Sequence, residues 1–101
     1  MENMEISKSF WNNKKVLITG NSGFKGSWLT LILHMLGAKL YGYSLKNSDK
    51  NSIFNFLNVQ KKIDEYQIGD IRNYEALEKF ILKIEPDIIF HLAAQPILIE
   101  S

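Results

Sequence analysis

The stretch KKVLITGNSGFKGSWLTLIL, residues 14–33, decides how this chain folds. Its first apolar run is rich in β-branched residues and predicts a buried strand over residues 15–19. Its second apolar run has the length of a helix and predicts one over residues 25–36. Between the two runs stand three glycines at a spacing of three residues, Gly20, Gly23 and Gly26. The stretch therefore predicts a strand, a glycine-rich turn and a helix.

The rest of the chain continues this alternation. Further strands are predicted over residues 39–45, 66–68 and 87–92, and further helices over residues 52–58 and 74–84. The pattern predicts an α/β fold, a partial Rossmann fold whose doubly wound parallel sheet has four strands in the order 3-2-1-4 and is truncated after the fourth strand. Right-handed crossovers then place the first two helices on one face and the last helix on the other. Apolar residues surround most of the first helix, which predicts that other elements cover it.

A glycine turn between a strand and a helix makes a site for an anion. The first backbone N–H groups of a helix lack internal partners, and the helix dipole adds to their attraction for negative charge. Gly20 allows a sharp turn, Gly23 allows a pyrophosphate to approach the backbone, and Gly26 allows the helix to lie close to the sheet. The alternative is a tight turn that binds no ligand.

Two later turns follow the third and fourth strands, and ligands of open parallel sheets bind at the carboxyl ends of the strands. Asp70, in the turn GDI, is placed to accept a hydrogen bond from an adenine amino group. Ala93 and Ala94, in the segment HLAAQP, leave room for a cofactor to pass over the sheet. The alternatives are turn chemistry or helix capping for Asp70 and close packing for the alanines. With the glycine turn, these strand ends predict one ligand-sized crevice.

Composition excludes several classes of protein. The 101 residues suit one domain, residues 1–101, with a formal net charge of +1 and no basic block that would indicate nucleic acid or an anionic membrane. The absence of cysteine excludes disulfides and thiolate metal sites, and it fits a reducing cytoplasm. The apolar stretches are far shorter than the ~20 residues of a membrane span. We therefore expect a cytoplasmic protein with no nucleic-acid partner, no membrane span and no metal site.

Four segments of the chain carry a resemblance to a known family, TGNSGFKGSW, GYSL, GDIRN and HLAAQP. Through them the chain resembles the N-terminal, NAD-binding part of the extended short-chain dehydrogenase/reductases, and within that family the CDP-glucose 4,6-dehydratases. The resemblance implies an NAD-dependent lyase that converts the nucleotide sugar CDP-glucose to CDP-4-keto-6-deoxyglucose for polysaccharide biosynthesis. It also implies a homodimer for the full-length relative.

The resemblance also implies which residues bind NAD. The residues that it assigns to the pyrophosphate turn are Gly20, Ser22, Gly23, Phe24, Lys25 and Gly26. It places Ser44 near the adenosine ribose, and Asp70 and Ile71 beside the adenine. The residues that it assigns to the path toward the nicotinamide are Leu92, Ala93, Ala94 and Gln95.

The chain departs from the pattern of the family at three places. No carboxylate ends the second predicted strand, where Tyr43 and Ser44 stand, so ribose recognition stays open. Ile99 stands near the place where many relatives carry an arginine. No Tyr-x-x-x-Lys pair occurs in the 101 residues, so no catalytic residue is assigned and the chain is expected to be inactive alone. The substrate domain, the rest of the cofactor domain and the dimer helices of the family are expected outside this segment.

Two other functions fit the same residues. The first is a fragment of a related nucleotide-sugar epimerase or dehydratase, which shares the glycine turn. The second is a regulatory domain that binds a dinucleotide and does no chemistry, whose full-length chain would lack the Tyr-x-x-x-Lys pair.

Overall fold

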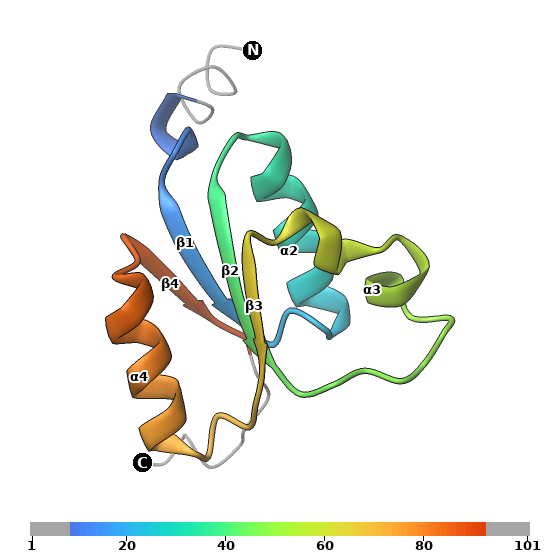
Figure 1. Cartoon of the computed structure of the whole chain (residues 1–101). Helices are drawn as coiled ribbons and strands as arrows, with labels where there is room; N and C mark the ends of the chain where they lie inside the picture. Colours follow the sequence, from blue (N-terminus) through green and yellow to red (C-terminus); the bar gives the residue numbers. More distant parts are fainter. Residues whose placement is uncertain (1–8, 93–101) are drawn as a thin grey trace.

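In the part of the chain that the structure describes, four parallel strands form a central sheet (Figure 1). The computed structural model describes residues 9–92. The strands are β1 (Lys15–Thr19), β2 (Lys39–Ser44), β3 (Glu65–Ile68) and β4 (Ile88–His91). Their order in the sheet is β3-β2-β1-β4, which confirms the predicted doubly wound arrangement.

The register of the strands brings their carboxyl ends to one edge of the sheet. Thr19, at the end of β1, lies opposite Tyr43 of β2 and His91 of β4. At the end of β2, Ser44 lies opposite Ile68 of β3. The turns that follow β1, β2 and β3 therefore leave the sheet side by side, as they do in ligand-binding sheets of this class.

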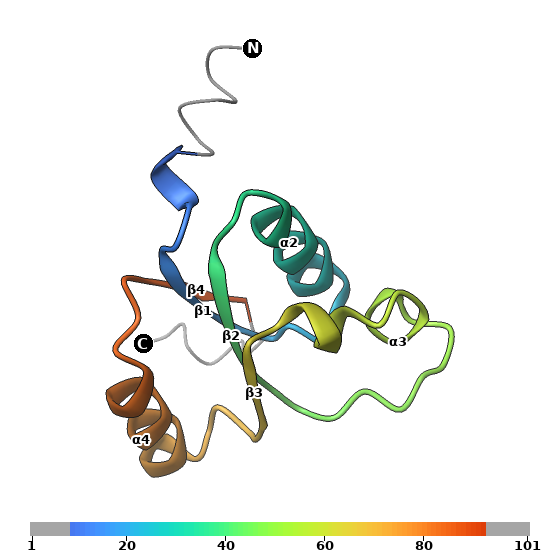
Figure 2. The ribbon, with the colours of Figure 1, turned by 45° about the horizontal axis from the view of Figure 1, so that its top comes forward.

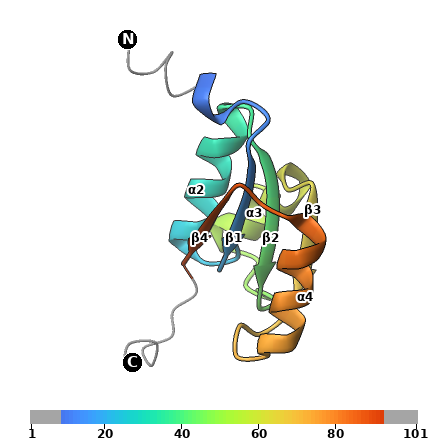
Figure 3. The same ribbon diagram turned by 90° about the vertical axis from the view of Figure 1, so that its left-hand side faces the viewer.

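Helices cover both faces of the sheet (Figures 2 and 3). One face carries α2 (Phe24–Met35), α3 (Ile53–Phe56) and the short 3-10 helix η1 (Val59–Lys62). The other face carries α4 (Tyr74–Ile84). This distribution confirms the expectation from right-handed crossovers. Within residues 9–92, no helix has the length and hydropathy needed to cross a membrane.

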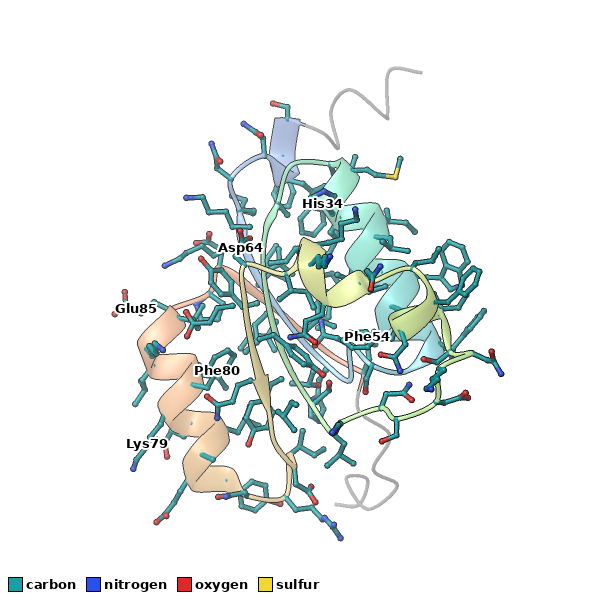
Figure 4. The ribbon with its side chains drawn as sticks, turned by 45° about the vertical axis from the view of Figure 1, so that its right-hand side comes forward. His34, Phe54, Asp64, Lys79, Phe80 and Glu85 are labelled. Atoms are coloured by element: carbon teal, nitrogen blue, oxygen red, sulfur yellow. The ribbon has the colours of Figure 1, made fainter. Side chains whose placement is uncertain are left out.

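Successive side chains of β1 point to opposite faces of the sheet and belong to two separate core clusters. Val16 and Ile18 are fully buried on the side of α2, and Leu17 is fully buried on the side of α4. Figure 4 shows Phe80 pointing from α4 toward the sheet, while Lys79 points away from it. Full burial of a side chain of this size stabilises a fold by about 1.5–3 kcal/mol. The strand that leads into the glycine turn is therefore held from both faces.

The outer side of α2 is apolar and exposed, so the prediction that other elements cover this helix is wrong for that side. The exposed side chains are Phe24, Trp28, Ile32 and Met35. The buried side of the helix carries mostly small residues, Gly26, Ser27, Thr30 and Leu33. Because small residues face the sheet, the helix lies close to it and the large apolar side chains remain outside.

The ends of β1 and α4 are as predicted, and those of the other elements differ from the prediction by one or a few residues. The largest difference concerns the helix predicted over residues 52–58, which is the shorter α3 followed by η1. Asn58 adopts a left-handed conformation, with φ of 52°, between these two elements. Asparagine tolerates the left-handed conformation, and a residue in this conformation interrupts an α-helix.

Candidate functional site

The turn after β1 is shaped by Gly20. Gly20 has a φ of +83°, a conformation that residues with a side chain rarely adopt. Its backbone N–H donates to the carbonyl of Tyr43, at 3.0 Å, and its own carbonyl accepts from the N–H of Gly23, at 3.1 Å. The turn is therefore tied to the end of β2 and closes on itself before α2 begins.

Gly26 and Gly23 serve different purposes in this turn. A Cβ at Gly26 would lie 2.8 Å from the Cα of Asn21 and would overlap the carbonyl of Gly20. A Cβ at Gly23 would meet only that carbonyl, at an ordinary distance of 3.5 Å, and Gly23 is exposed. Gly26 is thus needed for close packing of the helix, whereas Gly23 leaves the backbone open on the outer side.

Within residues 9–92, the N-terminus of α2 has no side-chain cap. Gly23 is the N-cap residue and provides no side chain, and the first turn contains no acidic residue. The first N–H groups of a helix carry partial positive charge that attracts anions. The open backbone at Gly23 and the uncapped helix form a cradle that fits a pyrophosphate.

Asn21 is a fully buried polar residue at the centre of the turn. Its side-chain Oδ1 accepts from the backbone N–H of Tyr43, at 3.1 Å. Its Nδ2 donates to the Thr30 hydroxyl, at 3.2 Å, and its carbonyl accepts from the Ser27 hydroxyl, at 2.9 Å. A Cβ at Gly42 would lie 2.6 Å from Oδ1, so that glycine makes room for the amide. Asn21 therefore joins β2, the turn and α2.

Ser22 fastens the glycine turn to the loop that follows β2. Its hydroxyl donates to the carbonyl of Leu45, at 2.9 Å. The side-chain amide of Asn47 donates to the carbonyl of Ser22, at 2.7 Å. The two loops at the carboxyl edge of the sheet are thus cross-linked by hydrogen bonds from both sides.

Ser44, at the end of β2, and Tyr66, within β3, form a hydroxyl pair. The hydroxyl of Ser44, a buried residue, is hydrogen-bonded to the phenol of Tyr66, and either oxygen can donate. Burial raises the pKa of Tyr66, while hydrogen bonds with Ser44 and Ser22 act in the opposite direction. The net effect keeps the phenol protonated, so it serves as a neutral hydroxyl.

Asp70 lies in the turn after β3 and already has a partner. Arg72 donates to the carboxylate from its Nη2 at 2.7 Å, from its Nε at 3.1 Å and from its backbone N–H at 2.9 Å. The side-chain hydrogen bond from Arg72 is the main reason why the pKa of Asp70 is lowered from 3.8. The carboxylate is therefore ionised at neutral pH and fixed in direction, as an acceptor for an amino group must be.

Replacing Arg72 with glutamine is expected to raise the pKa of Asp70 part of the way to 3.8, because the backbone hydrogen bond from residue 72 remains. Titration of the Asp70 carboxyl carbon by NMR measures this directly. In Arg72→Lys, which keeps the charge but not the fork of donors, the pKa of Asp70 should lie between its values in the unaltered chain and in the glutamine variant. An unchanged pKa in the glutamine variant would show that the hydrogen bonds from the Arg72 side chain do not hold the carboxylate.

The remaining predicted residues differ in their surroundings. Phe24 and Lys25 are exposed in the first turn of α2. Ile71 is buried in the core with Phe80 of α4 rather than on the surface of the turn. At the end of β4, the N–H of Leu92 donates to the carbonyl of Thr19, at 3.0 Å. The predicted residues that lie outside the described part of the chain are Ala93, Ala94 and Gln95.

The structure therefore brings part of the predicted set together. Gly20, Ser22 and Gly23 lie beside the end of β2, where Ser44 stands, and Asp70 follows the neighbouring strand. Sequence reasoning missed three residues that organise this edge, Asn21, Asn47 and Tyr66. A buried amide between two glycines is a local signal for Asn21. The other two contacts join residues 22 or more positions apart, and no local pattern indicates them.

Two hollows lie away from the glycine turn. One, of about 360 Å³, is lined by Gln67, Asn73, Glu75, Ala76, Lys79, Phe80 and Lys83. The other, of about 370 Å³, is lined by Phe54, Asn55, Asn58, Gln60 and Lys61. Neither contains a residue of the turn, and no cluster of three or more metal-ligating residues exists within residues 9–92. The backbone cradle at α2 is therefore the site with the clearest chemistry.

Comparison with known proteins assigns the family. Residues 17–101 match the sequence profile of a family described as GDP-mannose 4,6 dehydratase. The chain belongs to this family. The GDP-mannose 4,6 dehydratase profile covers all of the strand–turn–helix unit from Leu17 onward.

Individual relatives agree with this assignment. The chain is 43% identical over 93 residues to CDP-glucose 4,6-dehydratase of Salmonella typhimurium, which covers 92% of this chain and 26% of that protein. It shares 29% identity and a TM-score of 0.68 with the epimerase Mth375 of Methanothermobacter thermautotrophicus, over 91% of this chain and 26% of the other. The dTDP-glucose 4,6-dehydratase of Bacillus anthracis shares the fold, with a TM-score of 0.65, 24% identity, and coverage of 84% and 28%. This chain of the GDP-mannose 4,6 dehydratase family thus spans about a quarter of the length of these relatives.

Proposed function

We propose that this chain is the NAD-binding segment of a nucleotide-sugar 4,6-dehydratase that acts on CDP-glucose. The observation that carries the proposal is the uncapped N-terminus of α2, reached through a turn in which Gly23 leaves the backbone open. This cradle fits the pyrophosphate of a dinucleotide, and bound NAD supplies the acceptor for a hydride. In this proposal, the chain's own residues bind and orient the cofactor.

The end of β2 favours NAD over NADP. A 2′-phosphate usually needs an arginine at that place. The segment after Tyr43 reads SLKN, whose one cation is the exposed Lys46, without the planar fork of donors that matches a phosphate. The solved dTDP-glucose 4,6-dehydratase with the same fold is a complex with NAD, which is consistent with this choice.

CDP-glucose is proposed as the substrate because identity is higher to the CDP-glucose enzyme, 43%, than to the GDP-mannose 4,6 dehydratase 1 of Arabidopsis thaliana, 32%.

No Tyr-x-x-x-Lys pair occurs in these 101 residues, so the proposal assigns this segment cofactor binding and no proton transfer. The proposal includes a cytoplasmic location and a homodimeric enzyme, as the family resemblance implies. A second candidate, a GDP-mannose dehydratase, is favoured by the family profile.

Calorimetric titration tests the cofactor assignment. The chain is expected to bind NAD, and to bind NADP at least about tenfold more weakly, since an unpaired phosphate at the end of β2 costs about 1.4 kcal/mol or more. Lys46→Ala is the matched control, because it removes the one cation of that segment and should leave NAD binding unchanged. Tighter binding of NADP than of NAD would overturn the assignment.

A further inference from the structure

Tyr43 lies between the glycine turn and the turn after β3, and its backbone and its side chain contact different turns. Its backbone N–H donates to Oδ1 of Asn21, at 3.1 Å, and its carbonyl accepts from the N–H of Gly20, at 3.0 Å. Its side chain lies on the side of α4, in the core cluster that contains Leu17 and Phe80. The backbone of Tyr43 therefore holds the glycine turn, and its ring is free to contact another element.

The phenol of Tyr43 supports the turn after β3. Its hydroxyl donates to the backbone carbonyl of Asp70, at 3.4 Å. A Cβ at Gly69 would overlap the hydroxyl oxygen of Tyr43 and would lie 2.5 Å from Cζ of the ring. The backbone of the turn thus lies directly against the phenol, and residue 69 has no room for a side chain while the phenol keeps this place.

The phenol is fixed in position and is able to donate. Tyr43 is fully buried, and its ring packs against that of Phe80 in α4, with centroids 5.8 Å apart. Burial, and after it the charge of Asp70, raises the pKa of the Tyr43 phenol above 10.0. The phenol is therefore protonated at neutral pH, as a donor to a carbonyl must be.

The hydroxyl of Tyr43 connects the turn after β3 to β2 close to the Asp70 carboxylate. Arg72 directs that carboxylate from within the same turn, so its hydrogen bonds do not fix the carboxylate relative to β2. The N–H of Gly69 donates to the carbonyl of Ser44, at 2.9 Å, and holds the start of the turn. The Tyr43 hydroxyl holds the carbonyl of the next residue, Asp70 itself. A phenylalanine at position 43 would keep the ring and the backbone contacts and would lose only this connection.

We propose that Tyr43 is a positioning residue that sets the Asp70 carboxylate at a fixed place relative to the pyrophosphate cradle, so that one dinucleotide contacts both turns. This inference rests on the proposed NAD-binding function and on the position beside the adenine that the family resemblance implies for Asp70. Tyr43 itself is buried and does not touch the cofactor. It acts through its backbone on the glycine turn and through its hydroxyl on the turn of Asp70.

The test compares NAD with nicotinamide hypoxanthine dinucleotide, in which an oxygen replaces the amino group of the adenine. Calorimetry gives the dissociation constants for the unaltered chain, for Tyr43→Phe and for Gly69→Ala, which moves the turn from the other side of the contact. The unaltered chain is expected to prefer NAD about tenfold, because the carboxylate of Asp70 accepts only from the amino group. In each variant the preference should fall toward about one, through weaker binding of NAD and unchanged binding of the analogue.

Tyr41→Phe is the matched control, because it removes a phenol from the same face of β2 two residues earlier and should keep the tenfold preference. Circular dichroism of each variant checks that the fold is retained. A residue that only stabilised the fold would weaken both dinucleotides equally.

An unchanged preference in either variant, with or without equal weakening of both dinucleotides, overturns this inference and leaves the proposed function intact. Binding of NAD without any preference in the unaltered chain overturns it likewise, because Asp70 then receives no amino group. Absence of NAD binding to the unaltered chain overturns the proposed function and this inference with it.

Discussion

Replacing Gly26 with alanine is expected to lower the free energy of unfolding by about 3 kcal/mol and to abolish measurable NAD binding. The added Cβ would lie 2.8 Å from the Cα of Asn21 and would overlap the carbonyl of Gly20. These are backbone atoms, and Gly20 is held by its hydrogen bond to Tyr43. The turn cannot move out of the way of the new methyl group without breaking this hydrogen bond to β2. The helix must therefore move away from the sheet. Denaturant unfolding measures the loss.

Gly23→Ala is the matched control for this prediction. Its Cβ meets one atom at an ordinary 3.5 Å, and its φ of −82° is open to alanine. Stability should change by less than about 1 kcal/mol, as for an N-cap position, while NAD binding weakens because the methyl group stands in the cradle. Equal losses of stability in the two variants would contradict the separate purposes assigned to the two glycines.

Replacing Asn21 with alanine is expected to cost about 2–3 kcal/mol of stability and to weaken NAD binding about tenfold or more. The variant would lose the two hydrogen bonds of the buried amide, one from the N–H of Tyr43 and one to the Thr30 hydroxyl. The loss of two buried hydrogen bonds accounts for the expected cost. The turn would then keep its sequence but lose its attachment to β2 and α2.

Asn51→Ala, at an exposed asparagine in the loop after β2, is the control and should change stability by no more than about 0.5 kcal/mol. Amide hydrogen exchange provides a second readout, since the N–H of Tyr43 should exchange faster only in the Asn21 variant. Slow exchange at Tyr43 together with unaltered stability would show that the amide of Asn21 is not needed.

The sequence predicted those elements whose signals are local. The helix over residues 74–84 has the predicted ends, because Asn73 caps it through a hydrogen bond to the N–H of Ala76 and its apolar stripe faces the core. The strand order followed from βαβ alternation and the handedness of crossovers. The exposed side of α2 was not predictable in this way, since it depends on which small residues face the sheet.

In the candidate site, too, the residues with local sequence signals were predicted and the contacts between distant segments were not. The residue type and the spacing of Gly20 and Gly26 are visible in the sequence and predict their roles. The structure shows the positive φ of Gly20 and the close approach of the backbone at Gly26. The contact between Ser44 and Tyr66 joins two strands through a register that only the folded sheet defines. The resemblance places Ile71 beside the adenine, and the structure adds that its apolar side chain is buried with Phe80 of α4.

The central claim is that NAD binds across the glycine turn, and amide NMR spectra recorded during titration with NAD test it most directly. We expect the largest shift changes at the N–H groups of residues 22–27, with further changes at residues 44–47 and 70–72. Binding at the helix N-terminus perturbs those groups through hydrogen bonds and charge. Spectra that stay unchanged, or changes confined to the hollow between β3 and α4, would contradict the account.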